Sequence, residues 1–280
     1  MKQSVKHKGI TRVSLVAVKK EKDLLAIEEP LEIRLGYGLK NDRKQKNLAI
    51  TMRTPGNDEE LVLGFLYSEN IIHSKKDMLS VKPCVNKETG ELEDNVIRVE
   101  LSEKAEFDLE RLNRNFYTTS SCGVCGKASI ELIETVCTLQ IPKSYQVSKE
   151  VILALSEKIK SDQLVFSVTG GIHATALFDE TGKLELIQED VGRHNAFDKA
   201  VGKKLLNENI PLSKSIGLVS GRTSFELLQK AVMAGLPILC AIGAPSSLAV
   251  ELAEEFNITL IGFLKEKSFN IYTHPERILI

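Results

Sequence analysis

Two cysteines spaced three residues apart carry the most reactive side chains in this sequence. Cys122 and Cys125 lie in the stretch TTSSCGVCGKASIEL, between glycines and small hydroxyl residues and just before a stretch typical of a helix. The N-terminus of a helix stabilises a thiolate and lowers the pKa of a cysteine placed there. Gly123 and Gly126 favour an exposed loop. An exposed thiolate with a second thiol nearby is suited to carry a sulfane sulfur as a persulfide.

Other roles for this pair stay open. A zinc site needs four ligands, and neither a second CxxC pair nor an HxxxH pair follows the first. Cys137 falls on the apolar side of a helix predicted over residues 127–137, and Cys84 belongs to another unit. A thioredoxin-like pair follows a strand, which the residues before Cys122 do not resemble. We expect no metal site, and we keep a zinc or redox thiol protein as the alternative.

Loops with glycine and charged residues form a second group with possible chemistry. They follow or precede predicted strands and cover residues 168–173, 189–196, 219–224 and 242–247. Three of them lead into helices, whose N-termini offer free N–H groups to phosphates. Arg193 and Arg222 can add bidentate contacts to phosphate oxygens. Each loop alone is ordinary capping chemistry, but together they predict a site for a phosphate-bearing ligand.

Two units must position these residues. The first third of the chain predicts a small α+β unit, with a helix that follows the turn at residues 54–57 and ends near residue 69. Residues 103–120 lack periodicity and are typical of a linker. The strands expected in this unit cover residues 11–18, 31–35, 47–53, 81–83 and 96–101.

From about residue 147 strands and helices alternate. This order predicts a mostly parallel sheet covered on both faces, with ligands at the carboxyl ends of the strands. Helices are expected over residues 148–159, 196–206, 224–234 and 246–256, and strands over 164–168, 174–178, 184–187, 215–219, 237–242 and 259–263.

Composition limits the possible functions. The 280 residues are 42% apolar and 27% charged, as in globular proteins, and the net charge of −1 argues against a nucleic-acid coat or a membrane-surface role. We find no apolar run of about 18 residues and no secretory signal. The odd number of cysteines, five, favours a reducing cytoplasmic compartment. Residues 1–20 hold six Lys/Arg and no acid, which predicts a solvated arm; a docking surface for an acidic partner is the alternative.

Several longer motifs together resemble one family. The stretches TTSSCGVCGKAS, FSVTGGIHATAL, EDVGRHNAFDKAVG, LVSGRTSFELLQKA, AIGAPSSLAVELAEE and IGFLKEKSFNIYTHPERI occur in the order found in the formate dehydrogenase accessory sulfurtransferases, the FdhD family. The N-terminal stretch MRTPGNDEELVLGFLYSENII is similar to that family as well. The resemblance covers about residues 47–277.

The resemblance implies a function and its residues. A cysteine desulfurase passes sulfur to Cys122 as a persulfide, with Cys125 as the partner thiol, and the sulfur is transferred to a bis-guanine-dinucleotide molybdenum or tungsten cofactor before the cofactor enters formate dehydrogenase. A chaperone that holds this cofactor without transferring sulfur is a further alternative. The family usually has an arginine soon after the phenylalanine of the last motif, where this chain has Leu264-Lys265-Glu266-Lys267. The implied cofactor-binding stretch is Phe263, Leu264, Lys265, Glu266, Lys267 and Ser268.

The resemblance also implies a fold. A small N-terminal α+β domain over 1–115 and a CxxC loop with a connecting helix over 116–146 precede a cytidine-deaminase-like three-layer α/β/α domain over 147–280. The zinc-binding residues and the glutamate of deaminases are absent from the corresponding helix starts, which leaves the pocket for a guanine nucleotide. A homodimer is possible by resemblance alone. The further residues expected at the cofactor are His173, Arg193, His194, Asn195, Ser220 and Arg222.

Overall fold

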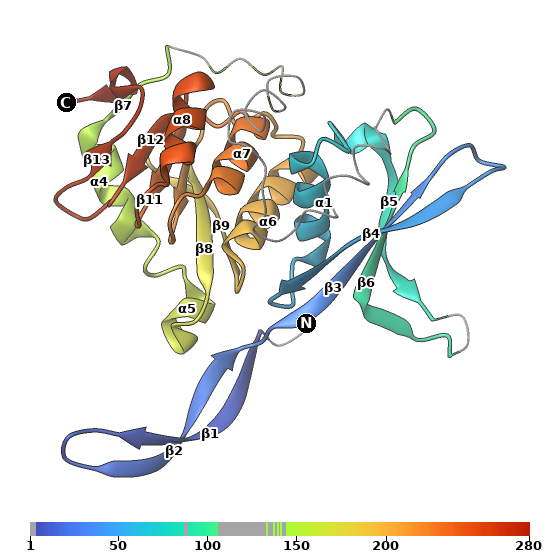
Figure 1. Ribbon diagram of the computed structural model, residues 1–280, viewed down its shortest axis with the longest axis horizontal. Helices are drawn as coiled ribbons and strands as arrows, with labels where there is room; N and C mark the ends of the chain where they lie inside the picture. Colours follow the sequence, from blue (N-terminus) through green and yellow to red (C-terminus); the bar gives the residue numbers. More distant parts are fainter. Residues whose placement is uncertain are drawn as a thin grey trace.

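Two β-sheets, with helices α1 and α6 packed between them, organise the molecule (Figure 1). The computed structural model describes residues 4–86, 89–105, 133, 137, 139, 141 and 144–280. The α/β fold class expected from the sequence is confirmed. The predicted domain boundaries remain predictions. No helix in the described ranges is long and apolar enough to cross a membrane.

The first sheet has four strands. β3 pairs in parallel with β6, and the outer pairs are antiparallel. Leu31, Ile33 and Leu35 alternate along β3 and are buried in the core that includes α1 (Asp58–Ser68), as expected for a strand with one buried face. The predicted strands after residue 30 and the helix are therefore confirmed. The strand order is β4 (Lys44–Arg53), β3 (Glu29–Tyr37), β6 (Leu92–Leu101), β5 (Met78–Val85), with the short helix η1 (Lys75–Asp77) before β5.

The second sheet has six strands and mixed pairing. Only the pairs β10–β11 and β11–β12 are parallel, so the prediction of a mostly parallel sheet is wrong. The other three pairs are antiparallel: β8 and β9 are joined by the short turn at 179–182, β13 folds back on β12, and β10 runs opposite to β8. The order is β13 (Asn270–Ile271), β12 (Thr259–Gly262), β11 (Ile238–Ala241), β10 (Ile216–Val219), β8 (His173–Phe178), β9 (Leu184–Asp190).

Helices cover both faces of this sheet, as the three-layer prediction requires. Alternate strand residues pack into two separate cores, one shared with α6 (Arg193–Leu206), α7 (Phe225–Met233) and α8 (Ser247–Glu255), the other with α4 (Lys149–Lys158). Serines cap three of these helices through their hydroxyls: Ser148, Ser224 and Ser246. Beside α4, β7 (Val147–Ser148) pairs with β14 (Ile278–Leu279), which follows η2 (Pro275–Arg277).

Two predicted strands are wrong. Residues 164–168 belong to the helix α5 (Leu164–Thr169), none of whose residues is buried, so an apolar run was mistaken for a buried strand. Residues 11–18 span a turn between β1 (Val5–Val13) and β2 (Val18–Ala26). No glycine or proline marks this turn; it is closed by hydrogen bonds between Ser14 and Ala17.

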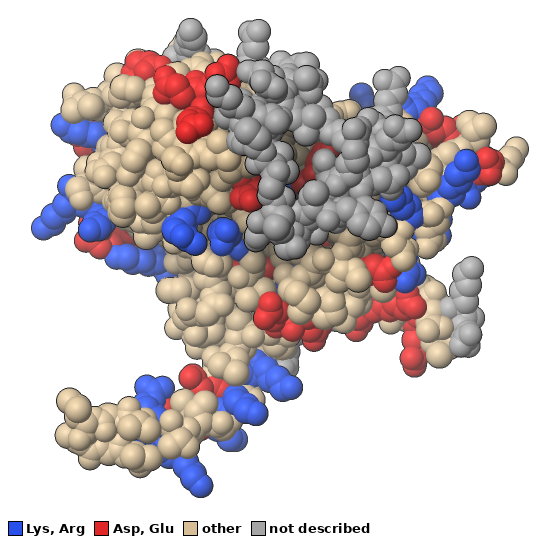
Figure 2. Space-filling model, in the orientation of Figure 1, with Lys and Arg blue, Asp and Glu red and all other residues tan. Residues whose placement is uncertain are grey.

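The β1–β2 hairpin extends away from the body of the molecule (Figure 1). Residues 4–26 include no buried side chain. Lys and Arg side chains project along its length, whereas its tip is apolar (Figure 2), with Val13, Leu15, Val16 and Val18 all more than two-thirds exposed. Its described residues therefore form the solvated basic arm that the charge pattern predicts.

Helices α1 and α6 cross at backbone contact. A Cβ added to Gly64 would lie 1.8 Å from the carbonyl oxygen of Asp198, and one added to Gly202 would lie 1.8 Å from that of Glu60. Only glycine permits this distance between the two helices. The crossing fixes the first sheet, which rests on α1, against the second, which rests on α6.

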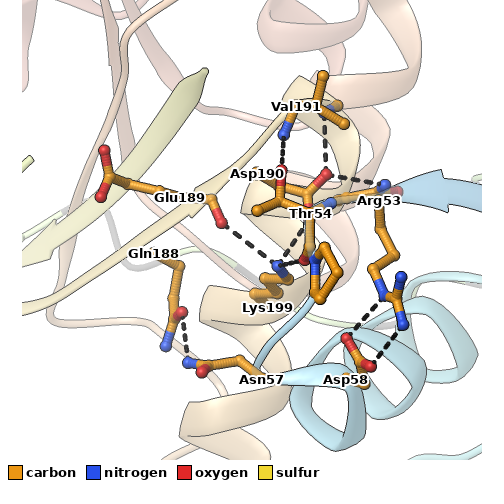
Figure 3. A network of polar contacts seen from close by, with 12 residues as sticks. Arg53, Thr54, Asn57, Asp58, Gln188, Glu189, Asp190, Val191 and Lys199 are labelled. Carbon is orange, nitrogen blue, oxygen red and sulfur yellow. Dashed lines mark hydrogen bonds and ion pairs between the residues drawn. The ribbon is translucent and has the colours of Figure 1, made fainter. Parts of the chain in front are cut away.

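A buried polar network strengthens the same junction (Figure 3). The Lys199 ammonium is 2% exposed and lies 2.6 Å from an Asp190 carboxylate oxygen, and it donates to the Thr54 carbonyl at 2.9 Å. Asp190 also accepts from the Thr54 N–H at 3.1 Å. The loop after β4 is thereby joined to β9 and α6. Nearby, Asn57 donates to Gln188 at 2.7 Å.

Candidate functional site

A cavity of about 900 Å³ opens at the edge of the second sheet where the parallel strands β10, β11 and β12 end. This is where open α/β sheets bind ligands. The walls come from α4, α5, the start of β8 and the loops that follow these three strands. The lining residues are Ser156, Ile159, Lys160, Gln163, Phe166, Gly170, Gly171, Ile172, His173, Ser220, Ile242, Leu264, Lys265, Glu266, Lys267 and Ser268.

Seven of the predicted cofactor-binding residues line this one cavity: His173, Ser220, Leu264, Lys265, Glu266, Lys267 and Ser268. Ser220 is held in place because its hydroxyl accepts the Ala174 N–H at 2.9 Å, while its own N–H donates to the Ala174 carbonyl at 3.0 Å. Gly221 leaves room for the imidazole beside it, since an added Cβ would lie 3.3 Å from Nδ1 of His173.

The loop after β12 is fixed by backbone hydrogen bonds. Phe263 has a positive φ of 54°, a conformation rare for a residue with a side chain. Its N–H donates to the Gly243 carbonyl at 3.1 Å, and the Leu264 N–H donates to the Ala241 carbonyl at 3.0 Å. Leu264 is thereby buried, and Lys265 and the residues after it reach the cavity. Phe263 itself is 44% exposed and does not line the cavity.

The acidic residue in this loop is neutralised locally. Glu266 accepts a hydrogen bond from Lys160 at 2.7 Å. This contact lowers the pKa of the glutamate and, together with Glu157, raises that of Lys160. Lys265 and Lys267 form no ion pair within the part of the chain that the structure describes. The cavity therefore keeps a positive rim even though Glu266 is present, as an anionic ligand requires.

His173 adds an uncharged polar group. Its pKa is lowered, first by burial and then by the positive charge of Arg193, against a smaller opposing effect of Asp190. A neutral imidazole donates one hydrogen bond and accepts another. His173 can thus contact the ribose or the base of a ligand.

Neither of the two predicted arginines is among the lining residues of this cavity. Arg193 begins α6, and its Nε is buried with no hydrogen-bond partner among the described residues. Arg222 packs against Gly243. The loops before α7 and α8 are joined by two bonds of 3.0 Å, from the Gly243 N–H to the Gly221 carbonyl and from the Ser246 N–H to the Thr223 carbonyl. The starts of these two helices are adjacent, as expected.

His194 and Asn195 line a different cavity, of about 500 Å³, between the first sheet, α1, α6 and α7. They are not among the residues that line the first cavity, so their predicted contact with the cofactor remains a prediction. They follow Arg193 on the first turn of α6, and a helix turns successive residues towards different sides. Asn195 has a structural role, since its amide donates to the Met52 carbonyl at 2.7 Å and to Asp190 at 3.1 Å.

Cys122 and Cys125 lie outside the described residues. Of the other cysteines, Cys137 packs against the core as predicted, with its sulfur 3.6 Å from the Val232 carbonyl oxygen. Cys240 is fully buried, which raises the pKa of its thiol. Among the described residues, no group of three or more His, Cys, Asp or Glu side chains could hold a metal ion.

Sequence reasoning missed part of the cavity wall. Phe166 and Gln163 were assigned to a buried strand and its flank, whereas they belong to α5 and its N-cap. Lys160 follows α4 and is not among the residues predicted at the site. The only sequence signal for this wall was the Gly170-Gly171 pair, which marks the end of α5.

The fold and the cavity define an α/β protein with a lysine-rimmed cavity at the strand ends. Comparison with known proteins makes this more specific. The model of the FdhD/NarQ family matches residues 26–279. The chain is 48% identical over 275 residues to the sulfur carrier protein FdhD of Saccharolobus solfataricus, covering 98% of each chain. It is 45% identical to the sulfur carrier protein FdhD of Streptomyces coelicolor, covering 100% of this chain and 98% of that one.

The chain therefore belongs to the FdhD/NarQ family, and the sulfur-carrier function expected from the sequence is confirmed at the level of the family. A crystal structure of a putative formate dehydrogenase accessory protein from Desulfotalea psychrophila matches 99% of this chain and 100% of its own, with a TM-score of 0.73 and 22% identity. This likeness supports the fold alone.

Proposed function

We propose that this protein carries sulfur as a persulfide on Cys122 from a cysteine desulfurase to a guanine-dinucleotide molybdenum or tungsten cofactor that serves formate dehydrogenase in the cytoplasm. The observation that carries the proposal is the cavity at the strand ends, which gathers His173, Ser220 and the 264–268 loop. Its size, its lysines and its neutral polar groups suit a nucleotide.

The residues of this cavity have separate roles in the proposal. Lys265 and Lys267 contact the diphosphate, while His173 and Ser220 contact the ribose or base. Lys160 keeps Glu266 from repelling the phosphates. The cofactor is the substrate here: its nucleotide end is held while its metal end receives the sulfur.

The sulfur step requires two exchanges. The Cys122 thiolate attacks the terminal sulfur of the donor's persulfide, forms a new S–S bond and releases the donor thiolate. In the second exchange the Cys125 thiolate attacks the Cys122 sulfur, the persulfide S–S bond breaks, and the terminal sulfur leaves at the sulfide level to the cofactor's metal. A Cys122–Cys125 disulfide forms, and a cellular dithiol must reduce it before the next cycle. Cys125 is the adjacent thiol that assists this release.

The sulfur-carrier part is tested by mass spectrometry after incubation with a cysteine desulfurase and cysteine. The wild-type chain should gain the mass of at least one sulfur atom and should activate formate dehydrogenase, and Cys122→Ala should lose both. Cys84→Ala, which removes a half-buried thiol in the first sheet, is the matched control and should keep both. A Cys122→Ala protein that still activates the enzyme would refute the role of this cysteine.

The nucleotide part is tested by calorimetric titration with GDP and ADP. GDP should bind, and ADP should bind more weakly. Lys265→Ala should weaken GDP binding by about ten-fold or more, because a charge-assisted contact to phosphate contributes roughly 1.5–3 kcal/mol. Lys203→Ala, on the outer part of α6, is the control and should bind GDP like the wild type. Equal affinity for both nucleotides would remove the guanine preference from the proposal.

A further inference from the structure

The helix α5 forms one wall of the cavity, yet the core does not hold it there. None of its six residues is buried, and Leu164 and Val168 are 72% and 48% exposed. A helix this short is unstable alone in water. Its position must therefore depend on contacts outside the core, namely packing against β2 of the hairpin and hydrogen bonds at its two ends.

Glu189 supplies the contact at the N-terminal end. Its two carboxylate oxygens accept the backbone N–H groups of Val165 and Phe166, each at 2.9 Å. The residue at the N-cap, Gln163, makes no capping hydrogen bond with its side chain. A carboxylate from the neighbouring strand β9 thus replaces the missing side-chain cap and accepts charge-assisted hydrogen bonds at the positive end of the helix.

The C-terminal end of α5 is also fixed through Phe166. Gly170 has a left-handed φ of 62°, and its N–H donates to the Phe166 carbonyl at 2.7 Å. Both backbone polar groups of Phe166 are therefore engaged, one by Glu189 and one by Gly170. Hydrogen bonds therefore fix the backbone of Phe166 although the helix has no buried residue.

The Phe166 side chain lines the cavity and is 43% exposed. It is the only Phe, Tyr or Trp among the lining residues within the described ranges. Aromatic rings held at the surface of a nucleotide site stack on the faces of bases, and each such contact contributes substantially to affinity. A ring that keeps nearly half of its surface in solvent beside a cationic rim is placed for this role.

We propose that Phe166 is the stacking platform for the purine base of the bound nucleotide, and that Glu189 is a positioning residue that holds this platform through α5. The inference rests on the proposed function, since it assigns the base of that same nucleotide. It also gives a reason for Glu189 within the EDVGRH stretch, next to Asp190 of the buried network.

Two substitutions at the ring and one control on the same helix test the platform by GDP calorimetry. Phe166→Leu keeps an apolar side chain but removes the flat ring, so it should lower the affinity for GDP about ten-fold. Phe166→Trp keeps a flat ring and should bind within about two-fold of the wild type. Leu164→Ala, on the same helix but outside the lining, is the matched control and should not change the affinity.

Glu189→Gln tests the positioning role. An amide cannot accept both N–H groups, so the variant should bind GDP several-fold more weakly, and the amides of Val165 and Phe166 should exchange faster with deuterium. A loss confined to α5, with an unchanged melting temperature, separates positioning from general destabilisation. Glu185→Gln, on the same strand but paired with Lys204, is the control and should match the wild type.

The two residues must be coupled if one acts through the other. In the Phe166→Leu background, Glu189→Gln should have little further effect on GDP affinity, whereas fully additive losses would overturn the positioning role. If the wild-type protein binds GDP and Phe166→Leu binds it with the same affinity, the platform is wrong but the nucleotide pocket stands. If the wild-type protein binds no GDP, the nucleotide pocket of the proposed function is itself wrong, and the platform falls with it.

Discussion

His194 shows how burial sets the protonation of a single residue. It lines the second cavity, and its Nε2 lies 3.3 Å from the Ser224 hydroxyl. Burial, followed by the positive charges of Arg193 and Lys230, lowers its pKa to about 4. The imidazole is therefore neutral in the folded protein at neutral pH, whereas in the unfolded chain it titrates near 6.5.

This difference predicts an acid-dependent loss of stability. Because the unfolded state binds the proton more tightly, stability falls as pH drops from about 7 to 4 and is unaffected by His194 above that range. The contribution of His194 to this loss should approach ~3 kcal/mol.

Urea unfolding of the wild type and of His194→Gln at several pH values measures this contribution. The difference in unfolding free energy between the two proteins should change by that amount across the window and stay constant above it. His7→Gln, on the exposed hairpin, should follow the wild type at every pH. A constant difference between wild type and His194→Gln down to pH 4 would contradict the lowered pKa.

At the scale of elements, the crossing of α1 and α6 depends on two glycines. Gly64→Ala or Gly202→Ala would place a methyl group inside the van der Waals radius of a backbone oxygen, which cannot move without shifting a whole helix. Each substitution should cost about 3 kcal/mol or more in unfolding free energy. Chemical denaturation measures this, with Gly9→Ala as the control, since no atom lies within 4 Å of a Cβ added there. Wild-type stability of both helix variants would show that the two helices are not in close contact.

The same scale shows what the sequence can and cannot predict. The helices at 149–158, 193–206, 225–233 and 247–255 follow from apolar periodicity, and serines cap all of them except 193–206; both signals are local. The helix α5 does not, because its cap is Glu189, more than twenty residues away. For the same reason Phe166 is absent from the residues predicted at the cavity, whereas the 264–268 loop, which the family motif indicates, lines it. His194 lines another cavity because adjacent residues of one motif can face different sides of a helix.

At the scale of the whole molecule, the Lys199–Asp190 pair couples the two units. Both side chains are almost completely buried, and removing one partner leaves the other charge buried and unpaired. Lys199→Met should therefore lower the unfolding free energy by about 3–5 kcal/mol. Lys203 pairs with Glu60, and its side chain is 42% exposed. Lys203→Met should therefore change the unfolding free energy by less than about 1 kcal/mol. Both values can be read from urea denaturation curves, and equal effects of the two substitutions would contradict the structural role of the buried pair.

The β1–β2 hairpin has a consequence for where the chain tolerates insertions. No side chain of residues 4–26 is buried, although β2 contacts α5. Insertions and deletions are tolerated where the backbone carries no core contacts. Insertions at the tip, around residues 14–17, should therefore leave the cavity and the helix crossing intact, whereas changes in β2 beside α5 would reach the wall of the cavity.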